Sequence, residues 1–474
     1  MSNQNKRFMF TELQPGIRRR NLVTFYMAAF VTIGLAVLLS VLQPFLLEAF
    51  LEIPSEEQGS VTGTATVVGE IVLLCVIGAW GAASDKVGRR MVYVFGMILV
   101  ALAYALLPLV SETVHLYMIR GIYAIGMAGA TGMMATLAGD YVLDRDRGKA
   151  NGFMGLCNAM GAAVAATVLA KVPVKLRESY IESGMEASEA AIAAGWRTYI
   201  MIGAMALFFA VLLRLGLAGR STDTKVERIP FSKRMKEGIE AAKEDRVTAI
   251  SYVTAFVARA DLAIAGLFIP LWCSLYIQEN PEALSSLGSY SEGGPEAAAC
   301  MADSICLSLG GLERAGILIA MIGAGSLFSA PLMGILTDRI NRLNAVAFAL
   351  ALNVVGYGLT YFVSDPFSTS MLFVVMIIGA GEVAGAISTQ SLIQQQAPER
   401  SRGSVIGFFG FCGGLGILVN SFLGGKMFDA ISYNAPFVWI AGLNLVVVFA
   451  CIAVNRSVRR EQEAKTDMEA HAAK

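Results

Sequence analysis

Two opposite charges stand close together in a stretch of the sequence that is otherwise apolar. The stretch, residues 256–270, reads "FVARADLAIAGLFIP" and contains Arg259 and Asp261. On a helix, side chains two residues apart point about 200° away from each other, so these two charges cannot form a pair. If the stretch crosses a membrane, each charge costs roughly 2.5–3.5 kcal/mol near the centre of the bilayer. Each charge therefore needs a partner on another helix or in a water-filled cavity.

Three further ionisable side chains stand inside apolar runs. Glu70 lies in "ATVVGEIVLLC", Glu382 in "IIGAGEVAGAIS" and Arg120 in "YMIRGIYAIGMAGATG". A carboxylate that alternates between a dry site and water can bind a proton on one side and release it on the other, and a nearby Arg alters that balance. His115, at the edge of an apolar run, and His471, near the chain end, are poorly placed for this task. We therefore predict a cavity for proton coupling or substrate that is formed by Glu70, Arg120, Arg259, Asp261 and Glu382.

Two alternatives assign these charges no function in a cavity. Arg259 and a carboxylate could form a buried ion pair that only joins helices, although apolar packing stabilises a protein better than such a pair. Arg120 lies about 7 Å along a helix from His115, at about 1.5 Å per residue, so its long side chain could reach the outer interface instead.

The composition explains which elements must carry these residues. Of the 474 residues, 55% are hydrophobic and only 16% are charged, whereas a soluble protein has about 25% charged residues. The formal net charge is zero, which gives no indication of a nucleic-acid partner. Because a membrane span needs about 20 mostly apolar residues, the sequence predicts twelve spans. They are residues 22–49, 60–83, 91–110, 116–140, 152–172, 196–218, 248–277, 314–336, 343–364, 369–393, 404–425 and 434–455.

The loops between the runs indicate an orientation in the membrane. Loops rich in Lys and Arg alternate with acidic or neutral loops, which places both termini in the cytoplasm. The exception is the loop with Lys171, Lys175 and Arg177, where glutamates offset the positive charge. The first apolar run is too long for a cleavable signal, so we expect it to remain as the first span.

The two halves of the chain repeat each other. Residues 30–44 match 256–270 without a gap, residues 81–90 match 334–342, and residues 144–157 match 399–412. Parallel repeats of six spans are one of the known transporter architectures, with the site near the midplane between the halves. In this match Arg259 and Asp261 stand opposite Ile33 and Leu35. The helix can therefore be built without these charges.

The loop after the second run carries a family signature. "GAASDKVGRR", residues 81–90, resembles the pattern Gly-x-x-x-Asp-Arg/Lys-x-Gly-Arg-Arg/Lys of the major facilitator superfamily, and a degenerate copy follows the eighth run. The resemblance covers nearly the whole chain. It implies an all-α membrane protein with 12 transmembrane helices in two pseudo-symmetric six-helix bundles. We expect bundles at residues 1–219 and 248–456, a cytoplasmic linker at 220–247 and a cytoplasmic tail at 457–474.

The same resemblance implies a cytoplasmic gate. In that superfamily Asp85 and Arg89 would brace span two against span eleven, with Asp140 at the end of span four completing the link. The alternative is that the basic residues only anchor the loops on the positive side of the membrane. The expected gate residues are Gly81, Asp85, Arg89, Arg90, Asp140, Gly334, Asp338, Arg339 and Arg342.

Seven cysteines give no metal-type spacing, and five of them lie in apolar runs as small buried side chains. Cys300 and Cys306 lie in a polar loop between spans seven and eight. A disulfide between them is possible if that loop faces a bacterial periplasm, and two free thiols are the alternative.

Together these features predict a secondary active transporter that moves a small organic solute across a bacterial inner membrane by alternating access. We expect proton coupling and favour export, and the alternative is a proton-coupled importer of an organic anion. A polytopic membrane enzyme fits less well, because no His–acid pair or phosphate-binding loop is visible. A sensor without transport activity also fits less well, because it has no reason to keep ionisable side chains in a cavity at the midplane. We expect no cofactor or metal, and a monomer whose partners are the solute, protons and the lipid bilayer.

Overall fold

The computed structural model describes residues 7–8, 11–143, 146–219, 231–287, 300–398 and 401–472. Within these ranges, twelve helical segments are long and apolar enough to cross a membrane, and each overlaps one of the twelve expected runs. Helices are suited to this environment because they satisfy their own backbone hydrogen bonds where no water is available. The chain is an all-α, multi-pass membrane protein.

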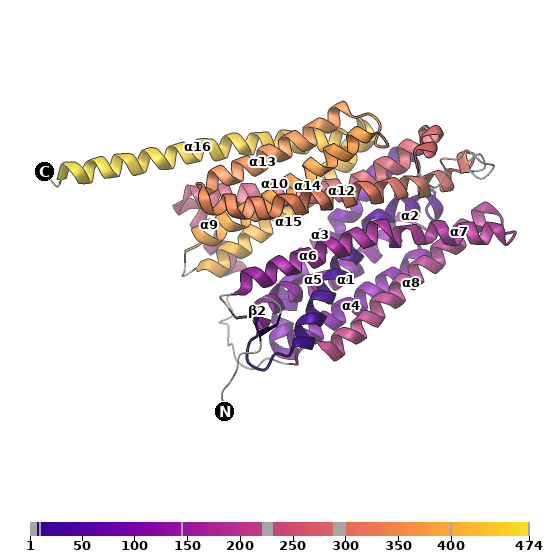
Figure 1. Ribbon diagram of the computed structural model, residues 1–474, viewed down its shortest axis with the longest axis horizontal. Helices are drawn as coiled ribbons and strands as arrows, with labels where there is room; N and C mark the ends of the chain where they lie inside the picture. The colour runs from indigo at the N-terminus through magenta and orange to yellow at the C-terminus, as the bar shows by residue number, and fades with distance from the viewer. Residues whose placement is uncertain are drawn as a thin grey trace. The chain divides into compact units, whose positions relative to one another are not determined.

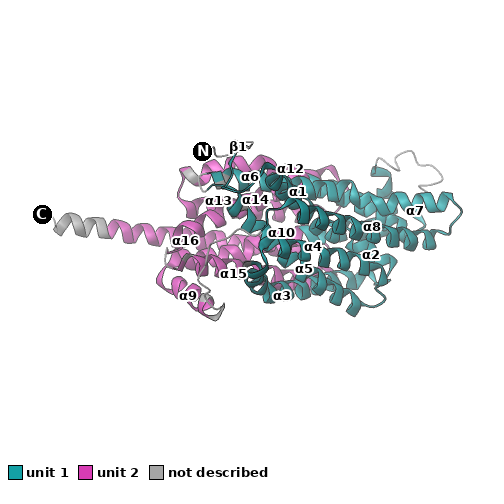
Figure 2. Ribbon diagram, turned by 90° about the horizontal axis from the view of Figure 1, so that it is seen from below, with its two compact units in different colours: residues 1–226, 266–320 teal, residues 227–265, 321–474 magenta. Residues whose placement is uncertain are grey.

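The chain forms two compact units, coloured separately in Figure 2. Unit 1 contains residues 1–226 and 266–320, and unit 2 contains residues 227–265 and 321–474. The first eight helices belong to unit 1: α1 (Arg19–Val41), α2 (Gln43–Ala49), α3 (Ser55–Val87), α4 (Arg89–Leu106), α5 (Thr113–Tyr141), α6 (Arg147–Thr167), α7 (Val172–Glu182) and α8 (Ala187–Gly216). Short 3-10 segments η1 (Leu107–Leu109) and η3 (Leu169–Lys171) and a hairpin of β1 (Arg7–Phe8) and β2 (Thr11–Glu12) complete this part.

The remaining helices follow in the order shown in Figure 1. They are α9 (Phe231–Glu244), α10 (Arg246–Glu279), α12 (Ser304–Arg339), α13 (Arg342–Leu359), α14 (Thr369–Gln396), α15 (Arg402–Ala430) and α16 (Ala435–Ala472), with 3-10 segments η4 (Pro281–Ser286) and η6 (Thr360–Phe362). By the residue ranges of the units, α10 and α12 each have one end in unit 1 and the other in unit 2. The domain limits expected from the repeat remain a prediction.

The same close helix contact occurs in both repeats. In unit 1, a Cβ atom added to Gly161 of α6 would lie 2.0 Å from the carbonyl oxygen of Phe30 on α1. In unit 2, a Cβ atom on Gly416 of α15 would lie 1.9 Å from the carbonyl oxygen of Phe256 on α10. These are equivalent positions in the repeat, and small residues let membrane helices approach closely. The pseudo-symmetry read from the sequence is thus present in the packing.

A second equivalent contact involves α4 and α13. Each helix has 18 residues and is followed at once by a three-residue 3-10 segment, η1 or η6. The hydroxyl of Tyr104 on α4 donates to the carbonyl oxygen of Leu35 at 2.5 Å. The hydroxyl of Tyr357 on α13 donates to the carbonyl oxygen of Asp261 at 2.7 Å. One hydrogen bond therefore fixes the same pair of helices in each half.

Some elements extend further than the sequence predicts. Residues 457–472, expected as a tail, continue α16 as one helix to Ala472 (Figure 1). The helix α12 begins at Ser304, before the expected start of its span. Within the expected linker, α9 packs inside unit 2, where a Cβ atom on Gly238 would lie 2.5 Å from Cβ of Phe408 and the carbonyl oxygen of Gly238 accepts the Tyr252 hydroxyl at 3.1 Å.

Candidate functional site

The carboxylate of Asp261 is enclosed by two amide side chains inside unit 2. Asn353 of α13 donates to Oδ2 at 2.6 Å, and Asn444 of α16 donates to Oδ1 at 2.8 Å. All three side chains are completely buried. Each carboxylate oxygen therefore receives one N–H donor, in a region of the bundle with no exposure to solvent.

Glu382 joins this group through Tyr357. The hydroxyl of Tyr357 lies 2.6 Å from Oε1 of Glu382 and 2.7 Å from the carbonyl oxygen of Asp261. A phenol has one hydrogen, and a carbonyl oxygen can only accept. The single hydroxyl hydrogen of Tyr357 is therefore shared between two acceptors, unless Glu382 carries a proton and donates it to the hydroxyl oxygen. A protonated Glu382, which is 4% exposed, would give each contact a hydrogen of its own.

Local sequence explains how four helices meet here. Asn353 and Tyr357 are four residues apart, so they share one face of α13. On α14, a Cβ atom at Gly381 would lie 2.0 Å from Oδ1 of Asn353. The small residue beside Glu382 therefore provides the space that the amide of Asn353 occupies. We call Asp261, Asn353, Tyr357, Glu382 and Asn444 the buried polar cluster.

Unit 1 shows that the fold does not require this cluster. The positions equivalent to Asp261, Asn353 and Tyr357 are Leu35, Val100 and Tyr104. The tyrosine–carbonyl hydrogen bond is the same, but the carboxylate and amide are replaced by aliphatic side chains. The additional polar groups of unit 2 cost stability in a membrane, which points to a function beyond helix packing.

The cluster also has unused acceptors. Among the described residues, Oδ1 of Asn353 and Oδ1 of Asn444 are buried and have no hydrogen-bond partner. If Asp261 gained a proton, rotation of one amide would let the carboxyl O–H donate to such an oxygen. The arrangement can therefore hold one proton on Glu382 and accommodate a second on Asp261.

Arg259 lies apart from this cluster. Its side chain is exposed, and its stem packs over α15, where a Cβ atom on Gly413 would be 2.6 Å from Cγ of Arg259. Within the described part of unit 2 it forms no ion pair or hydrogen bond. A buried pair between Arg259 and a carboxylate, the alternative considered above, is not seen in the described part of unit 2, where the carboxyl of Glu382 contacts Tyr357.

The other two expected cavity residues lie in unit 1. Arg120 of α5 is 8% exposed and lines a narrow gap together with Tyr104 and Tyr123, and its Nε and Nη2 atoms have no partner among the described residues. The alternative that Arg120 reaches the outer interface is thus wrong, because the side chain points into the bundle. Glu70 is partly buried on α3.

Comparison with known proteins identifies the family. The family described as Major Facilitator Superfamily matches residues 22–291 and 297–473. The chain belongs to the Major Facilitator Superfamily. It is a transporter-family protein and not an enzyme.

Similar proteins include two that are named for the magnetosome. "Magnetosome protein MamH" of Paramagnetospirillum magneticum (strain AMB-1) is 26% identical over 88% of this chain and 89% of its own length. "Magnetosome protein MamZ" of Magnetospirillum gryphiswaldense (strain MSR-1) is 24% identical over 86% of this chain, which spans 58% of the length of MamZ. Among solved structures, the nucleoside transporter NupG has a TM-score of 0.61 and 15% identity, over 92% of this chain and 99% of NupG. The last comparison shows the fold alone.

The superfamily gate residues of the first half are only partly described. Nε of Arg89 lies 2.7 Å from Oδ2 of Asp140, which joins the start of α4 to the end of α5. Asp85 lies in α3, but its side chain is outside the described residues. A Cβ atom on Gly81 would meet nothing within 4 Å, so Gly81 makes no close helix contact within the described part of unit 1. Arg90 has a buried Nε with no described partner.

The matching residues of the second half show a similar arrangement. Gly334 lies at an open position on α12, and Arg339 is exposed at its end. The side chain of Asp338 is outside the described residues. Arg342 begins α13 and lines a surface pocket described below.

Two ion pairs at the opposite end account for the exception in the charge pattern. Nζ of Lys171 lies 2.6 Å from Oε1 of Glu313, and the guanidinium of Arg177 pairs with Oδ2 of Asp303. Both pairs lie within unit 1, between the η3–α7 segment and the start of α12. Two of the three bases that break the expected Lys and Arg pattern are thus neutralised by acids of another segment.

One of these acids lies in the short loop closed by a disulfide. Cys300 and Cys306 are bonded to each other, and Asp303 lies between them. Oδ1 of Asp303 accepts the backbone N–H groups of Ile305 and Cys306 at 3.0 and 3.1 Å, which caps the first turn of α12. The bridge, the cap and the contact with Arg177 therefore share one short segment.

Three residues of the buried polar cluster were not predicted from the sequence. Asn353, Tyr357 and Asn444 are uncharged polar residues in spans, and such residues often serve only hydrogen bonds between helices. A usable signal was the equivalence of Tyr104 and Tyr357 in the two repeats, together with Asn353 one turn before Tyr357.

Proposed function

We propose that this protein is a secondary active transporter that couples movement of a small organic solute to protons by alternating access. The observation that carries the proposal is the buried polar cluster, in which Tyr357 joins the carboxyl group of Glu382 to the backbone of Asp261, and two amides hold the carboxyl group of Asp261. Membership of the superfamily supports transport. The two oxygen contacts of the single Tyr357 hydroxyl support a proton on Glu382 inside the membrane.

The coupling step follows from the geometry of the cluster. In the buried state Glu382 keeps its proton and donates a hydrogen bond to Tyr357, whose hydroxyl in turn donates to the carbonyl oxygen of Asp261. When the helices rearrange and water reaches the cluster, the carboxyl proton passes to water and leaves a solvated carboxylate. Net proton movement requires that Glu382 release its proton to the water on one side of the membrane and be protonated again from the water on the other side, since an unpaired carboxylate is costly in low dielectric.

Reconstituted protein tests this proposal. A screen of solutes by thermal shift first selects one that binds the native protein. That solute is then added to proteoliposomes containing a pH-sensitive dye. We expect solute-driven proton movement with the wild type and none with Glu382→Gln, which still binds the solute. Equal proton movement with both proteins would refute the assignment.

Export is the direction favoured by the sequence, and a specific observation supports the alternative of organic-anion import. Arg120 has buried nitrogen atoms without a described partner, and Arg259 is exposed and unpaired within the described part of unit 2. Both guanidinium groups suit a carboxylate or phosphate. Uptake of labelled anions with and without a proton uncoupler separates the two: accumulation that the uncoupler abolishes favours import.

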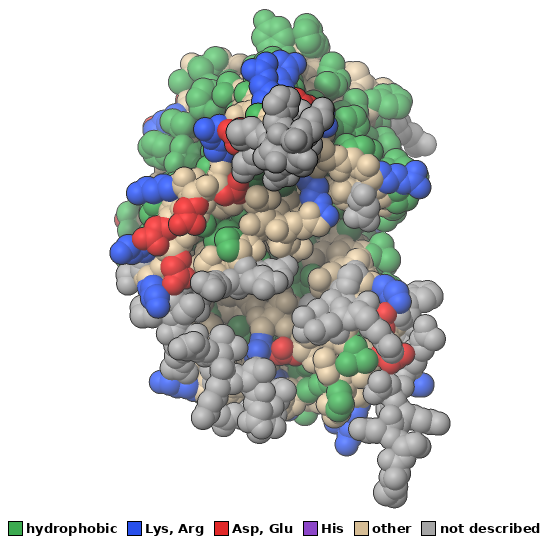
Figure 3. Space-filling view, turned by 90° about the vertical axis from the view of Figure 1, so that its left-hand side faces the viewer, with side chains coloured by type: hydrophobic (Ala, Val, Ile, Leu, Met, Phe, Trp, Pro, Cys, Tyr) green, Lys and Arg blue, Asp and Glu red, His purple; other side chains and the backbone are tan. Residues whose placement is uncertain are grey.

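The proposed location is a bacterial inner membrane, with both termini in the cytoplasm and the protein acting as a monomer. The positions of Lys and Arg support this orientation, and charged side chains gather on the end of the helices where α16 continues to the C-terminus (Figure 3). The names of MamH and MamZ suggest the magnetosome as a second location. A fluorescent fusion at Lys474 in cells with magnetosomes distinguishes the two locations.

A further inference from the structure

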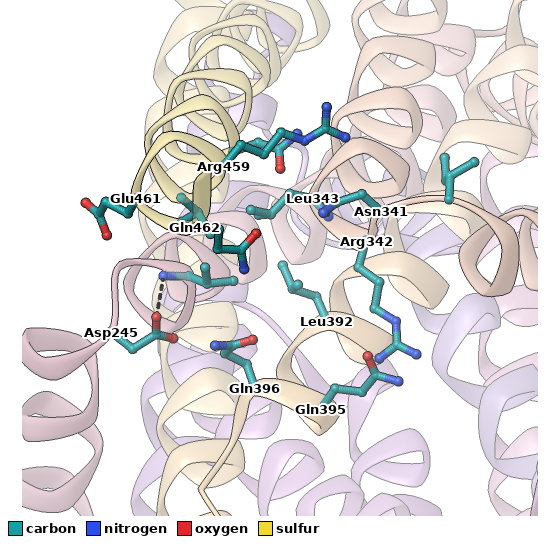
Figure 4. Close-up of a pocket in the computed structure, with 14 residues that line it drawn as sticks. Asp245, Asn341, Arg342, Leu343, Leu392, Gln395, Gln396, Arg459, Glu461 and Gln462 are labelled. Atoms are coloured by element: carbon teal, nitrogen blue, oxygen red, sulfur yellow. Dashed lines mark hydrogen bonds between the residues drawn. The ribbon is translucent and has the colours of Figure 1, made fainter. Parts of the chain in front are cut away.

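A pocket of about 570 Å³ lies at one end of unit 2, away from the buried polar cluster. Figure 4 shows its lining, in which Arg342, Gln395 and Gln396 surround the opening while Glu461 points away. Because Arg339, Arg342 and Arg459 stand at this end of the helices, the positive-inside pattern places the pocket at the cytoplasmic surface.

The acids near this pocket are already engaged. Asp245 caps α10, since its two carboxylate oxygens accept the backbone N–H groups of Val247 at 3.2 Å and Thr248 at 2.8 Å. Glu461 pairs with Arg246 at 2.9 Å. Neither carboxylate is therefore available to neutralise the basic residues of the lining.

The bases of the pocket, in contrast, are not engaged. Nη1 of Arg342 is buried and has no hydrogen-bond partner among the described residues. Arg459 likewise forms no ion pair or hydrogen bond with the residues that the structure describes. A buried guanidinium N–H without an acceptor is costly, and the amide groups of Gln395 and Gln396 add donors beside it. An anion in the pocket would give these donors an acceptor.

The pocket and the buried polar cluster lie on the same four helices. Each of α10, α13, α14 and α16 contributes to both, and the two sites are separated by roughly 16–21 Å along each helix at about 1.5 Å per residue. Between them is an apolar layer that includes Ile250, Val346, Leu350, Val447 and Cys451. This layer makes the pocket a poor water path to the carboxyl groups, so its function is separate from proton release.

We propose that this pocket binds a phosphate group, carried either by a lipid headgroup or by a soluble phosphate compound. Two guanidinium groups with flanking amide donors match the oxygens of a phosphate, for which Arg is the best suited side chain. The backbone N–H groups at the start of α13 also face negative charge favourably. The bound anion joins the ends of the four helices that hold the buried polar cluster.

Purified protein allows the test without any transport assay, so its outcome is independent of proton coupling. In one arm, inorganic phosphate is titrated against protein in detergent, and the unfolding midpoint is followed. In the other arm, nanodiscs with phosphatidylglycerol are compared with nanodiscs of phosphatidylcholine, and bound lipid is counted by native mass spectrometry. We expect Arg342→Gln to weaken binding by about ten- to a hundredfold in at least one arm.

The variants keep the result interpretable. Arg456→Gln is the matched control, because Arg456 is an exposed base on α16 that does not line the pocket. Arg459→Gln changes an exposed lining residue and so tests the site even if Arg342→Gln folds poorly. A loss in the phosphate arm assigns a soluble phosphate, and a loss in the lipid arm assigns a headgroup. If the pocket variants bind like Arg456→Gln in both arms, the pocket is not a phosphate site.

Discussion

Replacement of Tyr357 by Phe is the most direct test of the two hydrogen bonds that the Tyr357 hydroxyl forms in the buried polar cluster. The change removes one oxygen and keeps the ring, which stacks on Phe437 with centroids 6.4 Å apart. The lost hydroxyl contacts two buried oxygens, at 2.6 and 2.7 Å. At about 0.5–1.5 kcal/mol for each net hydrogen bond, we expect the free energy of unfolding to fall by roughly 1–3 kcal/mol.

The equivalent tyrosine provides a matched control. Tyr104→Phe removes the same bond to a backbone carbonyl oxygen in unit 1, where the position of Asp261 is occupied by Leu35. Its expected cost is about 1 kcal/mol. The difference between the two substitutions therefore reports the contact with Glu382, and a double-mutant cycle with Glu382→Gln isolates that contact.

Infrared difference spectroscopy observes the proton itself. We expect the wild type at neutral pH to show the C=O stretch of a protonated carboxyl that Glu382→Gln lacks, and we expect Tyr357→Phe to shift this band because an acceptor is lost. If the wild type shows only carboxylate bands for Glu382, or if Tyr357→Phe destabilises the protein no more than Tyr104→Phe does, Glu382 does not hold a proton against Tyr357.

Three further changes have defined outcomes. Glu382→Gln should leave the protein folded but abolish net transport, measured in proteoliposomes with folding checked by gel filtration, and normal transport would exclude a coupling role. Arg89→Gln should lower the free energy of unfolding by at most about 1 kcal/mol, because the pair of Arg89 with Asp140 is partly exposed. The same change should slow transport without weakening solute binding. Unchanged turnover would show that the pair is only a structural contact. Gly416→Ala should lower the free energy of unfolding by about 1–3 kcal/mol, because the added methyl group overpacks the contact with α10. Gly410→Ala is the control and should have no such effect, because nothing lies within 4 Å of the added atom. Equal denaturation midpoints of the two variants would contradict the close contact.

The fold was predictable because its signals are long and repeated. Twelve apolar runs are visible without any structure, and the matches between halves identify equivalent positions such as Phe30 and Phe256. The packing of Gly161 and Gly416 on these two residues shows that the alignment is correct at single-residue level. Hydrophobic length and internal duplication therefore determine most of the architecture.

The site was less predictable, for a physical reason. Asp261 and Glu382 were found because a charge in an apolar run is conspicuous. Their partners were not, because uncharged amides are common in spans as hydrogen-bonding groups between helices, and the direction of each amide depends on helix rotation. Arg259 and Asp261 face different neighbours, as their two-residue spacing indicated. The spacing did not reveal that Glu382 would contact Tyr357 and not Arg259.

The tyrosine–carbonyl bond common to both halves has an evolutionary meaning. A single ancestral six-helix unit with this bond accounts for Tyr104 and Tyr357 alike, whereas the carboxylate beside the bond is present in one copy only. The first half thus shows the same scaffold without a carboxylate at this position. Protein engineers can use it as the starting point for building a second ionisable centre, with Leu35 and Val100 as the positions to change.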